Sequence, residues 1–332
     1  MKVVVRQQAL TLVVPIKLGQ EAAMDAWLRE HKRQIQRALH NSSTTHFARL
    51  VLLPPSLGEG GETIGTQQLL ALETNFDGEL SDHVADLRAS LGPLLDGAFQ
   101  WAEGYPGSFD LAALSRFVRQ GSYRSAAFYV AHGGLSVPVV RADAALKQRL
   151  EARLQELSVG ARVRSQSAVA LAQELQATAR SLAAERGLSL GVIDRGLPVD
   201  PPDEFRTALQ RPLSVLVAFA LAPIYELRDA FKRRSAPSFA TAELRRKRDF
   251  IGLEEDRVDQ NGITHLVAIK PGAYRMFALK LMLWLATALA TLGARVGRLG
   301  GLETIHFARW VILPDRRLLF FSNYDGGWEA YL

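Results

Sequence analysis

The chain has 332 residues, 48% of them hydrophobic and 22% charged, which is typical of a globular protein and is long enough for two domains. Its formal net charge of +6 is small for this length, so the charge gives no reason to predict nucleic-acid binding. The sequence contains no cysteine, which excludes disulfides, thiolate nucleophiles, iron–sulfur clusters and cysteine-type zinc sites, and which is compatible with a reducing cytoplasm.

The first predicted elements are a strand and an amphipathic helix. Leu10 to Lys17 is a β-rich run. Because the apolar run Ala9 to Ile16 is short, contains Pro15 and lacks a small-residue cleavage site, it is typical of a strand and not of a signal peptide. Gln20 to Leu39 follows, with apolar residues at four- and eight-residue steps, which predicts a helix with one apolar face. That face consists of Ala23, Trp27, Ile35 and Leu39.

The next segment, His46 to Pro54, occurs again at His306 to Pro314 with only two substitutions. Each copy is followed by a second apolar run that ends in Asn, an aromatic residue, Asp and Gly, at 75–78 and at 323–326. Two matched motifs in the same order indicate an internal duplication, which fixes the architecture of the chain.

Each copy is predicted to run strand, helix, strand, strand. In the second copy Leu266 to Lys270 is the first strand, and Tyr274 to Arg295 is the helix that follows it. The first copy continues with a helix capped by Ser81 and a fourth strand at Ala126 to Val130, which completes a βαββαβ unit. The second copy reaches Leu332 before these last two elements, so we expect it to be C-terminally truncated.

The predicted fold class is α+β, with two ferredoxin-like βαββαβ repeats whose sheets pack face to face as an α/β-barrel-like pair, helices outside. We assign residues 1–145 to the first repeat, 146–262 to a helical connector and 263–332 to the second, incomplete repeat. Within the connector, Leu146 to Leu157 and Ser165 to Arg186 are predicted helices.

The connector also contains an uncharged apolar segment, Leu213 to Tyr225, which is followed by the basic residues Lys232, Arg233 and Arg234. The segment is too short for a helix that spans a bilayer, which needs about 20 residues. Two interpretations remain open, namely a buried core helix and a segment that lies in the membrane interface beside basic side chains.

Strand alternation predicts that the histidine and the arginine of each His-Phe-Ala-Arg segment lie on opposite faces. Each arginine stands in an otherwise apolar strand, so we expect it to pair with the aspartate of the neighbouring strand or with backbone. Structural and chemical roles are both open for these groups. The histidines are candidate bases or haem ligands, and His306 is the first candidate for binding a cofactor. The candidate catalytic residues are His306, Arg309, His46, Arg49, Asp77 and Asp325.

Other catalytic motifs are absent from the sequence. There is no Walker A sequence, no GxGxxG after a predicted strand, no HExxH and no GxSxG elbow. Four further histidines have no metal-ligand spacing, so no metal site is predicted. These are His31, His40, His83 and His265.

The paired His-Phe-Ala-Arg and Asn-x-Asp-Gly segments, with the stretch from Thr264 to Gly272, resemble a little-characterised group of bacterial proteins in the dimeric α/β-barrel superfamily. The same superfamily includes dye-decolourising peroxidases and chlorite dismutase-like proteins, which place two ferredoxin-like units in one chain and bind haem, and small monooxygenases without a cofactor. The resemblance therefore implies haem as a candidate cofactor. The chain departs from the GxxDG motif of the peroxidases, because Thr74 and Ser322 replace its first glycine.

The functional hypothesis is binding of an apolar or haem-like small molecule between the sheets, with peroxidase- or monooxygenase-like oxidative chemistry. The alternative is a non-enzymatic protein, either membrane-peripheral through Leu213 to Tyr225 or a scaffold that pairs with another subunit. The expected location is the cytoplasm, with membrane association under the alternative. The sequence predicts neither the substrate nor the oligomeric state.

The haem hypothesis makes one direct prediction. If His306 binds haem, protein from haem-supplemented cells shows a Soret band in its absorbance spectrum, and His306→Ala loses that band. A spectrum without the band after addition of haemin contradicts the hypothesis.

Overall fold

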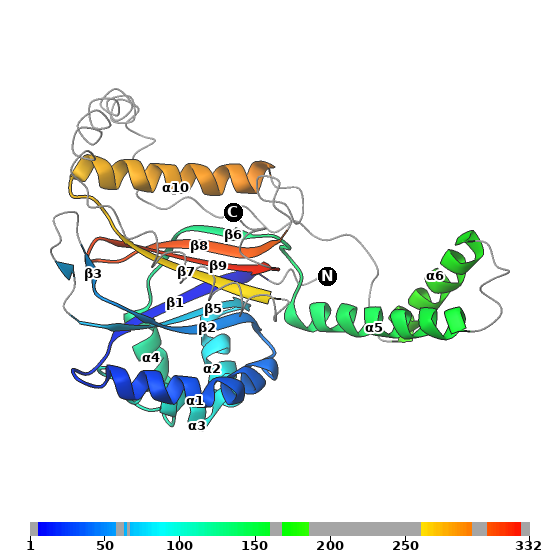
Figure 1. The fold of residues 1–332 in the computed structure, drawn as a ribbon, viewed down its shortest axis with the longest axis horizontal. Coiled ribbons are helices and arrows are strands. Elements are labelled where there is room, and N and C mark those ends of the chain that lie inside the picture. Colours follow the sequence, from blue (N-terminus) through cyan, green and yellow to red (C-terminus); the bar gives the residue numbers. More distant parts are fainter. Residues whose placement is uncertain are drawn as a thin grey trace, which may run out of the picture.

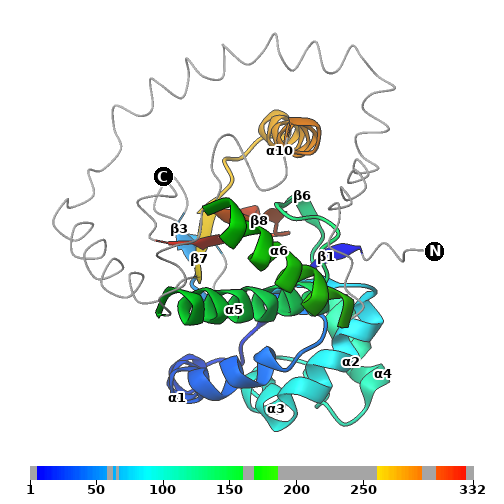
Figure 2. The same ribbon diagram turned by 90° about the vertical axis from the view of Figure 1, so that its right-hand side faces the viewer.

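The computed structural model describes residues 6–57, 63–64, 67–159, 168–185, 260–293 and 304–326, which form two main antiparallel sheets with helices on their outer sides (Figure 1). Figure 2 shows helices α1 (Glu21–His40) to α4 (Leu111–Gly121) on one side of the molecule and the long helix α10 (Ala273–Gly293) on the other. The apolar segment Leu213 to Tyr225 lies outside the described residues. Within the described ranges, no helix is long and apolar enough to cross a bilayer.

The first sheet has three strands in the order β1-β5-β2, and both neighbouring pairs are antiparallel. Its strands are β1 (Gln7–Pro15), β2 (Thr45–Leu53) and β5 (Leu69–Asp77). The helices that cover its outer face are α1 (Glu21–His40), α2 (Leu80–Leu91), α3 (Pro93–Phe99) and α4 (Leu111–Gly121). Because Glu79 occupies the N-cap of α2, the predicted capping role of Ser81 is wrong.

The second sheet has four antiparallel strands in the order β6-β8-β9-β7, and α10 lies along its outer side (Figure 1). These elements are β6 (Ser125–Val130), β7 (Gln260–Ala268), α10 (Ala273–Gly293), β8 (Ile305–Ile312) and β9 (Arg317–Asp325). The predicted loop after β2 contains the short hairpin of β3 (Ser56–Leu57) and β4 (Thr63–Ile64). The two connector helices, α5 (Val137–Val159) and α6 (Ala168–Glu185), project away from the sheets.

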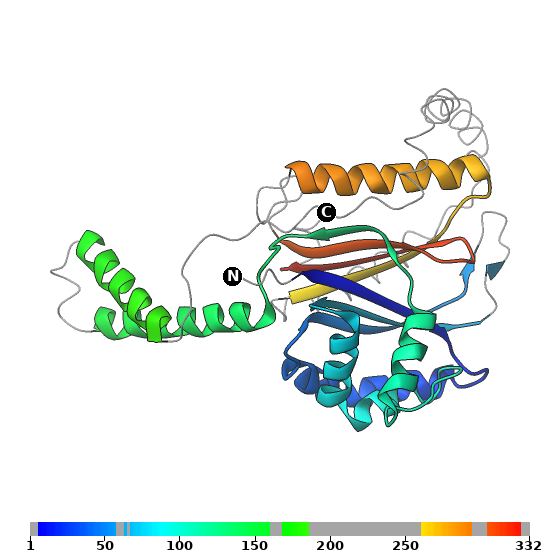
Figure 3. The same ribbon diagram turned by 180° about the vertical axis from the view of Figure 1, so that it is seen from behind.

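Strand β6 does not join the sheet to which the sequence assigned it. After α4 the chain forms an isolated β-bridge with β1, between Ser122 and Leu12. Strand β6 then pairs with β8 (Figure 3). The first sheet therefore has three strands and the second has four, and the described residues form no closed barrel. Strand periodicity identified β6 correctly, but pairing partners far apart in sequence leave no local signal.

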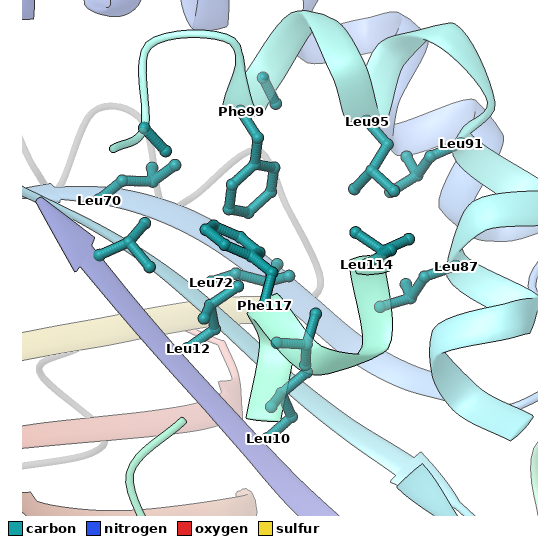
Figure 4. Close-up of a cluster of buried hydrophobic side chains, with 14 of the residues drawn as sticks. Leu10, Leu12, Leu70, Leu72, Leu87, Leu91, Leu95, Phe99, Leu114 and Phe117 are labelled. Atoms are coloured by element: carbon teal, nitrogen blue, oxygen red, sulfur yellow. The ribbon is translucent and has the colours of Figure 1, made fainter. Parts of the chain in front are cut away.

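The larger hydrophobic core lies between the first sheet and its helices. Figure 4 shows Leu12 and Leu72 from the strands against Phe99 and Phe117 from the helices. Full burial of such a side chain contributes about 1.5–3 kcal/mol. A cavity of about 20 Å³ remains among these apolar side chains, and neither His46 nor His306 lines it.

A second core lies between the two sheets. Side chains of β1, β2 and β5 there meet side chains of β8 and β9, as face-to-face packing of the two sheets predicts. The buried members are Val13, Leu53, Ala71, Val311, Leu313, Leu319 and Phe321. This layer also contains the polar groups that form the candidate site.

His83 connects helix α2 to the first sheet. Its ring is fully buried and stacks on Phe76 with the ring centroids 4.0 Å apart. Its Nδ1 lies 2.9 Å from Thr44 Oγ1 and its Nε2 lies 2.7 Å from Thr74 Oγ1. Burial lowers the pKa of His83 from 6.5 to about 4, against the opposing charge of Asp86. Both ring nitrogens are therefore used in structural hydrogen bonds by a neutral imidazole.

His83 makes the stability of the fold depend on pH. The unfolded chain binds a proton near pH 6.5 whereas the folded chain binds it near about 4, so stability is full above 6.5 and is lost as pH falls towards 4. We expect this residue to account for a loss of roughly 3 kcal/mol between these values. Urea denaturation of wild type and His83→Gln across this range measures the loss, and His40→Gln, at the exposed end of α1, is the control. Parallel pH profiles for wild type and His83→Gln would contradict the assignment.

Candidate functional site

A β-bulge occurs at the same point of both copies. The pairing of β2 with β5 shifts between Thr45 and Phe47, and that of β8 with β9 shifts between Ile305 and Phe307. The extra residue is His46 in the first copy and the equivalent histidine in the second. A bulge turns two successive side chains to one face. The expectation from strict alternation, that histidine and arginine lie on opposite faces, is therefore wrong.

The bulges direct both histidines into the layer between the sheets, where each meets an aspartate. His46 Nε2 lies 2.8 Å from Asp77 Oδ1, and His306 Nε2 lies 2.8 Å from Asp325 Oδ2. We call these pairs the first dyad and the second dyad. The predicted Arg–Asp pairs do not form, because the aspartates face the histidines instead.

Aromatic rings pack between the two dyads. Phe47 stacks near His306 and Phe307 lies near His46, with ring centroids 5.6 Å apart in both pairs. The two phenylalanine rings are themselves 5.6 Å apart. The four rings thus fill the space beside both imidazoles.

The two dyads differ in exposure and in hydrogen bonding. In the first dyad the side chains of His46 and Asp77 are 7% and 8% exposed, and the backbone N–H of Val137 donates to Asp77 Oδ2 at 2.6 Å. In the second dyad the side chains are 22% and 48% exposed. The outer carboxylate oxygen of this pair, Oδ1 of Asp325, has no hydrogen-bond partner among the described residues, because His306 Nε2 contacts Oδ2. The first dyad is closed and satisfied, whereas the second is open and unsatisfied.

A third histidine, His132, lies beside the second dyad. Its ring centroid is 6.1 Å from that of His306. Burial lowers the pKa of His132, the nearby His306 lowers it further, and the charge of Asp325 opposes both effects. A neutral imidazole therefore stands next to the open dyad.

The two arginines share one buried carboxylate that the sequence analysis did not single out. Arg49 Nε donates to Glu73 Oε2 at 2.7 Å, and Arg309 donates to Glu73 Oε1 at 2.9 Å. Arg309 and Glu73 are each 1% exposed. Burial lowers the pKa of Arg309, while Glu73 acts in the opposite direction. The sequence signal for Glu73 was an acidic residue in an otherwise apolar strand, where the second copy has Phe321.

Each arginine also reaches the opposite sheet. Arg49 donates to Thr264 Oγ1 at 3.0 Å and to the carbonyl oxygen of Ser322 at 2.9 Å. Arg309 makes the reciprocal contacts, with Thr11 Oγ1 at 3.1 Å and the carbonyl oxygen of Thr74 at 2.9 Å. The expectation that the arginines bond to backbone is confirmed in both copies. The guanidinium N–H groups of both arginines form hydrogen bonds that connect the two sheets, which is a structural role.

Gly262 on β7 admits the Arg49 side chain. A Cβ atom at this position would lie 2.8 Å from the Arg49 guanidinium. A residue larger than glycine would therefore push the guanidinium out of its hydrogen bonds.

The residues present do not fit haem between the sheets. A porphyrin is a flat ring system much larger than one side chain, and the aromatic rings beside His46 and His306 occupy that space. In addition, a carboxylate lies 2.8 Å from Nε2 of each histidine. The packing therefore predicts no Soret band in the absorbance experiment.

Comparison of the chain with protein-family models, with curated proteins and with solved structures finds no match in any of the three. The resemblance to the dimeric α/β-barrel superfamily therefore stays a prediction. The feature of the described residues that bears on function is the geometry of the second dyad.

Removing the charge of Glu73 is expected to destabilise the protein strongly. In Glu73→Gln the buried guanidinium of Arg309 and the partly buried one of Arg49 lose their shared counter-charge, and breaking a buried pair such as that of Arg309 costs about 3–5 kcal/mol. Denaturant unfolding measures the loss. The control is Glu156→Gln, which removes a carboxylate from an exposed pair with Arg153 and should change little. A Glu73→Gln protein as stable as wild type would show that the shared carboxylate does not hold the sheets together.

Proposed function

We propose that the protein binds a small molecule at the second dyad, His306 and Asp325, and that the dyad exchanges a proton with it. One observation carries the proposal, namely that the same His–Asp pair is closed in the first copy and open in the second. Buried polar atoms are normally satisfied, so an unpartnered carboxylate oxygen on a side chain that is 48% exposed favours a ligand.

The groups around the dyad favour a ligand with an apolar ring and an ionisable hydroxyl or N–H group. The ring of Phe47 beside His306 offers an apolar surface, and Asp325 Oδ1 offers a polar atom without a partner among the described residues. An imidazole next to a carboxylate can take a proton from such a group, because the carboxylate stabilises the imidazolium that forms. The neutral His132 is placed to accept a further hydrogen bond.

The ferredoxin-like description of the two copies is part of the same proposal. Both copies run strand, helix, strand, strand, and their three strands are arranged in the same order, β1-β5-β2 and β7-β9-β8. This agreement supports a common ancestry of the halves and a barrel-like pairing of their sheets. No described residue favours the membrane-peripheral alternative, whose segment Leu213 to Tyr225 lies outside the described residues.

Phenol is a suitable first probe, since it combines an aromatic ring with an ionisable hydroxyl. Titration of phenol into protein with labelled histidines, followed by NMR, is expected to shift the ring signal of His306 until it saturates. Asp325→Asn should weaken binding about tenfold, equivalent to about 1.4 kcal/mol, because the neutral amide stabilises a proton on His306 less well.

His46→Gln is the matched control for this titration. It changes the equivalent residue of the closed dyad and is expected to leave the phenol-induced shift of His306 in place. The ring signal of the neighbouring His132 reports binding in both variants. A saturable shift of that signal that persists in His306→Gln, or that is lost equally in both variants, would contradict the proposal.

A further inference from the structure

Reciprocal contacts relate the two halves of the intersheet layer by an approximate two-fold axis. The cross-sheet contacts of Arg49 are repeated by Arg309 at matching strand positions, and the two dyads repeat each other. Near the axis Asn75 Nδ2 lies 2.9 Å from Asn323 Oδ1. The axis relates β1 to β7, β2 to β8 and β5 to β9.

Strand β6 breaks this symmetry. It pairs with the outer edge of β8. The residues just before β6 contact β1, where Tyr123 donates its backbone N–H to the carbonyl oxygen of Thr11 at 2.8 Å. The two-fold axis relates the position of β6, beside β8 and near β1, to an equivalent position beside the outer edge of β2 and near β7. In the described part of the chain no strand pairs with the outer edge of β2 or of β7. An unpaired strand edge of nine residues is a template for another strand.

We propose that the outer edge of β2 binds an extended strand of another polypeptide, antiparallel to β2, at the position equivalent to that of β6. The contact between Arg49 and Thr264 does not obstruct this position, because the equivalent contact between Arg309 and Thr11 coexists with β6 on the other side. The main-chain groups of β2 supply the affinity, as in other cases of strand addition.

The chemistry of β6 indicates which strand fits. It alternates the buried Ala127 and Tyr129 with Phe128, whose ring lies 6.2 Å from that of Phe307. A partner strand should therefore place a small and an aromatic residue on its outer face and one aromatic residue towards Phe47, the equivalent of Phe307.

The same symmetry connects strand binding to the second dyad. The chain that continues from β6 brings the N–H of Val137 to Asp77, while the equivalent carboxylate oxygen of Asp325 has no partner among the described residues. A bound segment that continues past its strand in the same way would donate an N–H to Asp325. A long partner segment should therefore compete with phenol, whereas one that ends with the strand should not.

The test uses two synthetic peptides with the sequence of β6, one covering residues 122–131 and one covering residues 122–138, and the full chain. Hydrogen exchange should slow in β2 and β7 when either peptide is added, and exchange in β8 should not change. A peptide of scrambled sequence is the control. N-methylation of alternate residues gives two further variants of the short peptide, and one of the two should lose binding, because only one set of N–H groups points to β2.

The outcomes separate this proposal from the proposed function. Protection of β8 instead of β2 would show that the peptide displaces β6, and absence of protection at millimolar peptide would show that β2 binds no such strand; either result overturns the proposal. Equal binding of both N-methylated variants would also overturn it. Phenol binding at His306 is measured separately, so its failure leaves the result at β2 unaffected, and protection of β2 does not depend on it.

Discussion

The buried guanidinium of Arg309 and the partly buried guanidinium of Arg49 lie in the layer between the sheets, and the single carboxylate of Glu73 contacts both. The remaining donors of each arginine bond across to the opposite sheet. Removing charges from water is costly, so this network is stable only when both sheets are present and in register. The apolar side chains around it supply attraction between the sheets, while the arginines fix how the sheets are positioned on each other.

The position of the two dyads follows from that register. A bulge in β2 and a bulge in β8 turn a histidine into the layer at the same end, where an aspartate from the neighbouring strand meets it. The two dyads contain the same residue types and differ in their surroundings. Val137 closes the first dyad, whereas in the second dyad Asp325 Oδ1 has no partner among the described residues. A structural pair and a candidate site thus arise from identical residue types.

The asymmetry of β6 extends this difference to the sheets. One strand completes the edge of β8 and brings the residues that cover the first dyad, and the equivalent position beside β2 has no strand among the described residues. Among the described residues, no counterpart of residues 122–137 contacts the outer edge of β2 or Asp325, so the open edge and the open dyad lie at related positions. Strand addition and ligand binding are therefore expected to influence each other.

The sequence by itself determined the repeated motifs and the order of strands and helices that accompanies them, because periodicity and repetition are local properties of the chain. It also singled out His46, His306, Asp77 and Asp325 as candidates. Only the tertiary structure decided their pairing, since a bulge depends on backbone register and overrides strict alternation. It likewise decided that Glu73 serves both arginines and that β6 joins the second sheet. Contacts between residues more than 200 positions apart, such as that of Arg309 with Glu73, form only when the sheets pack, and no local pattern encodes them.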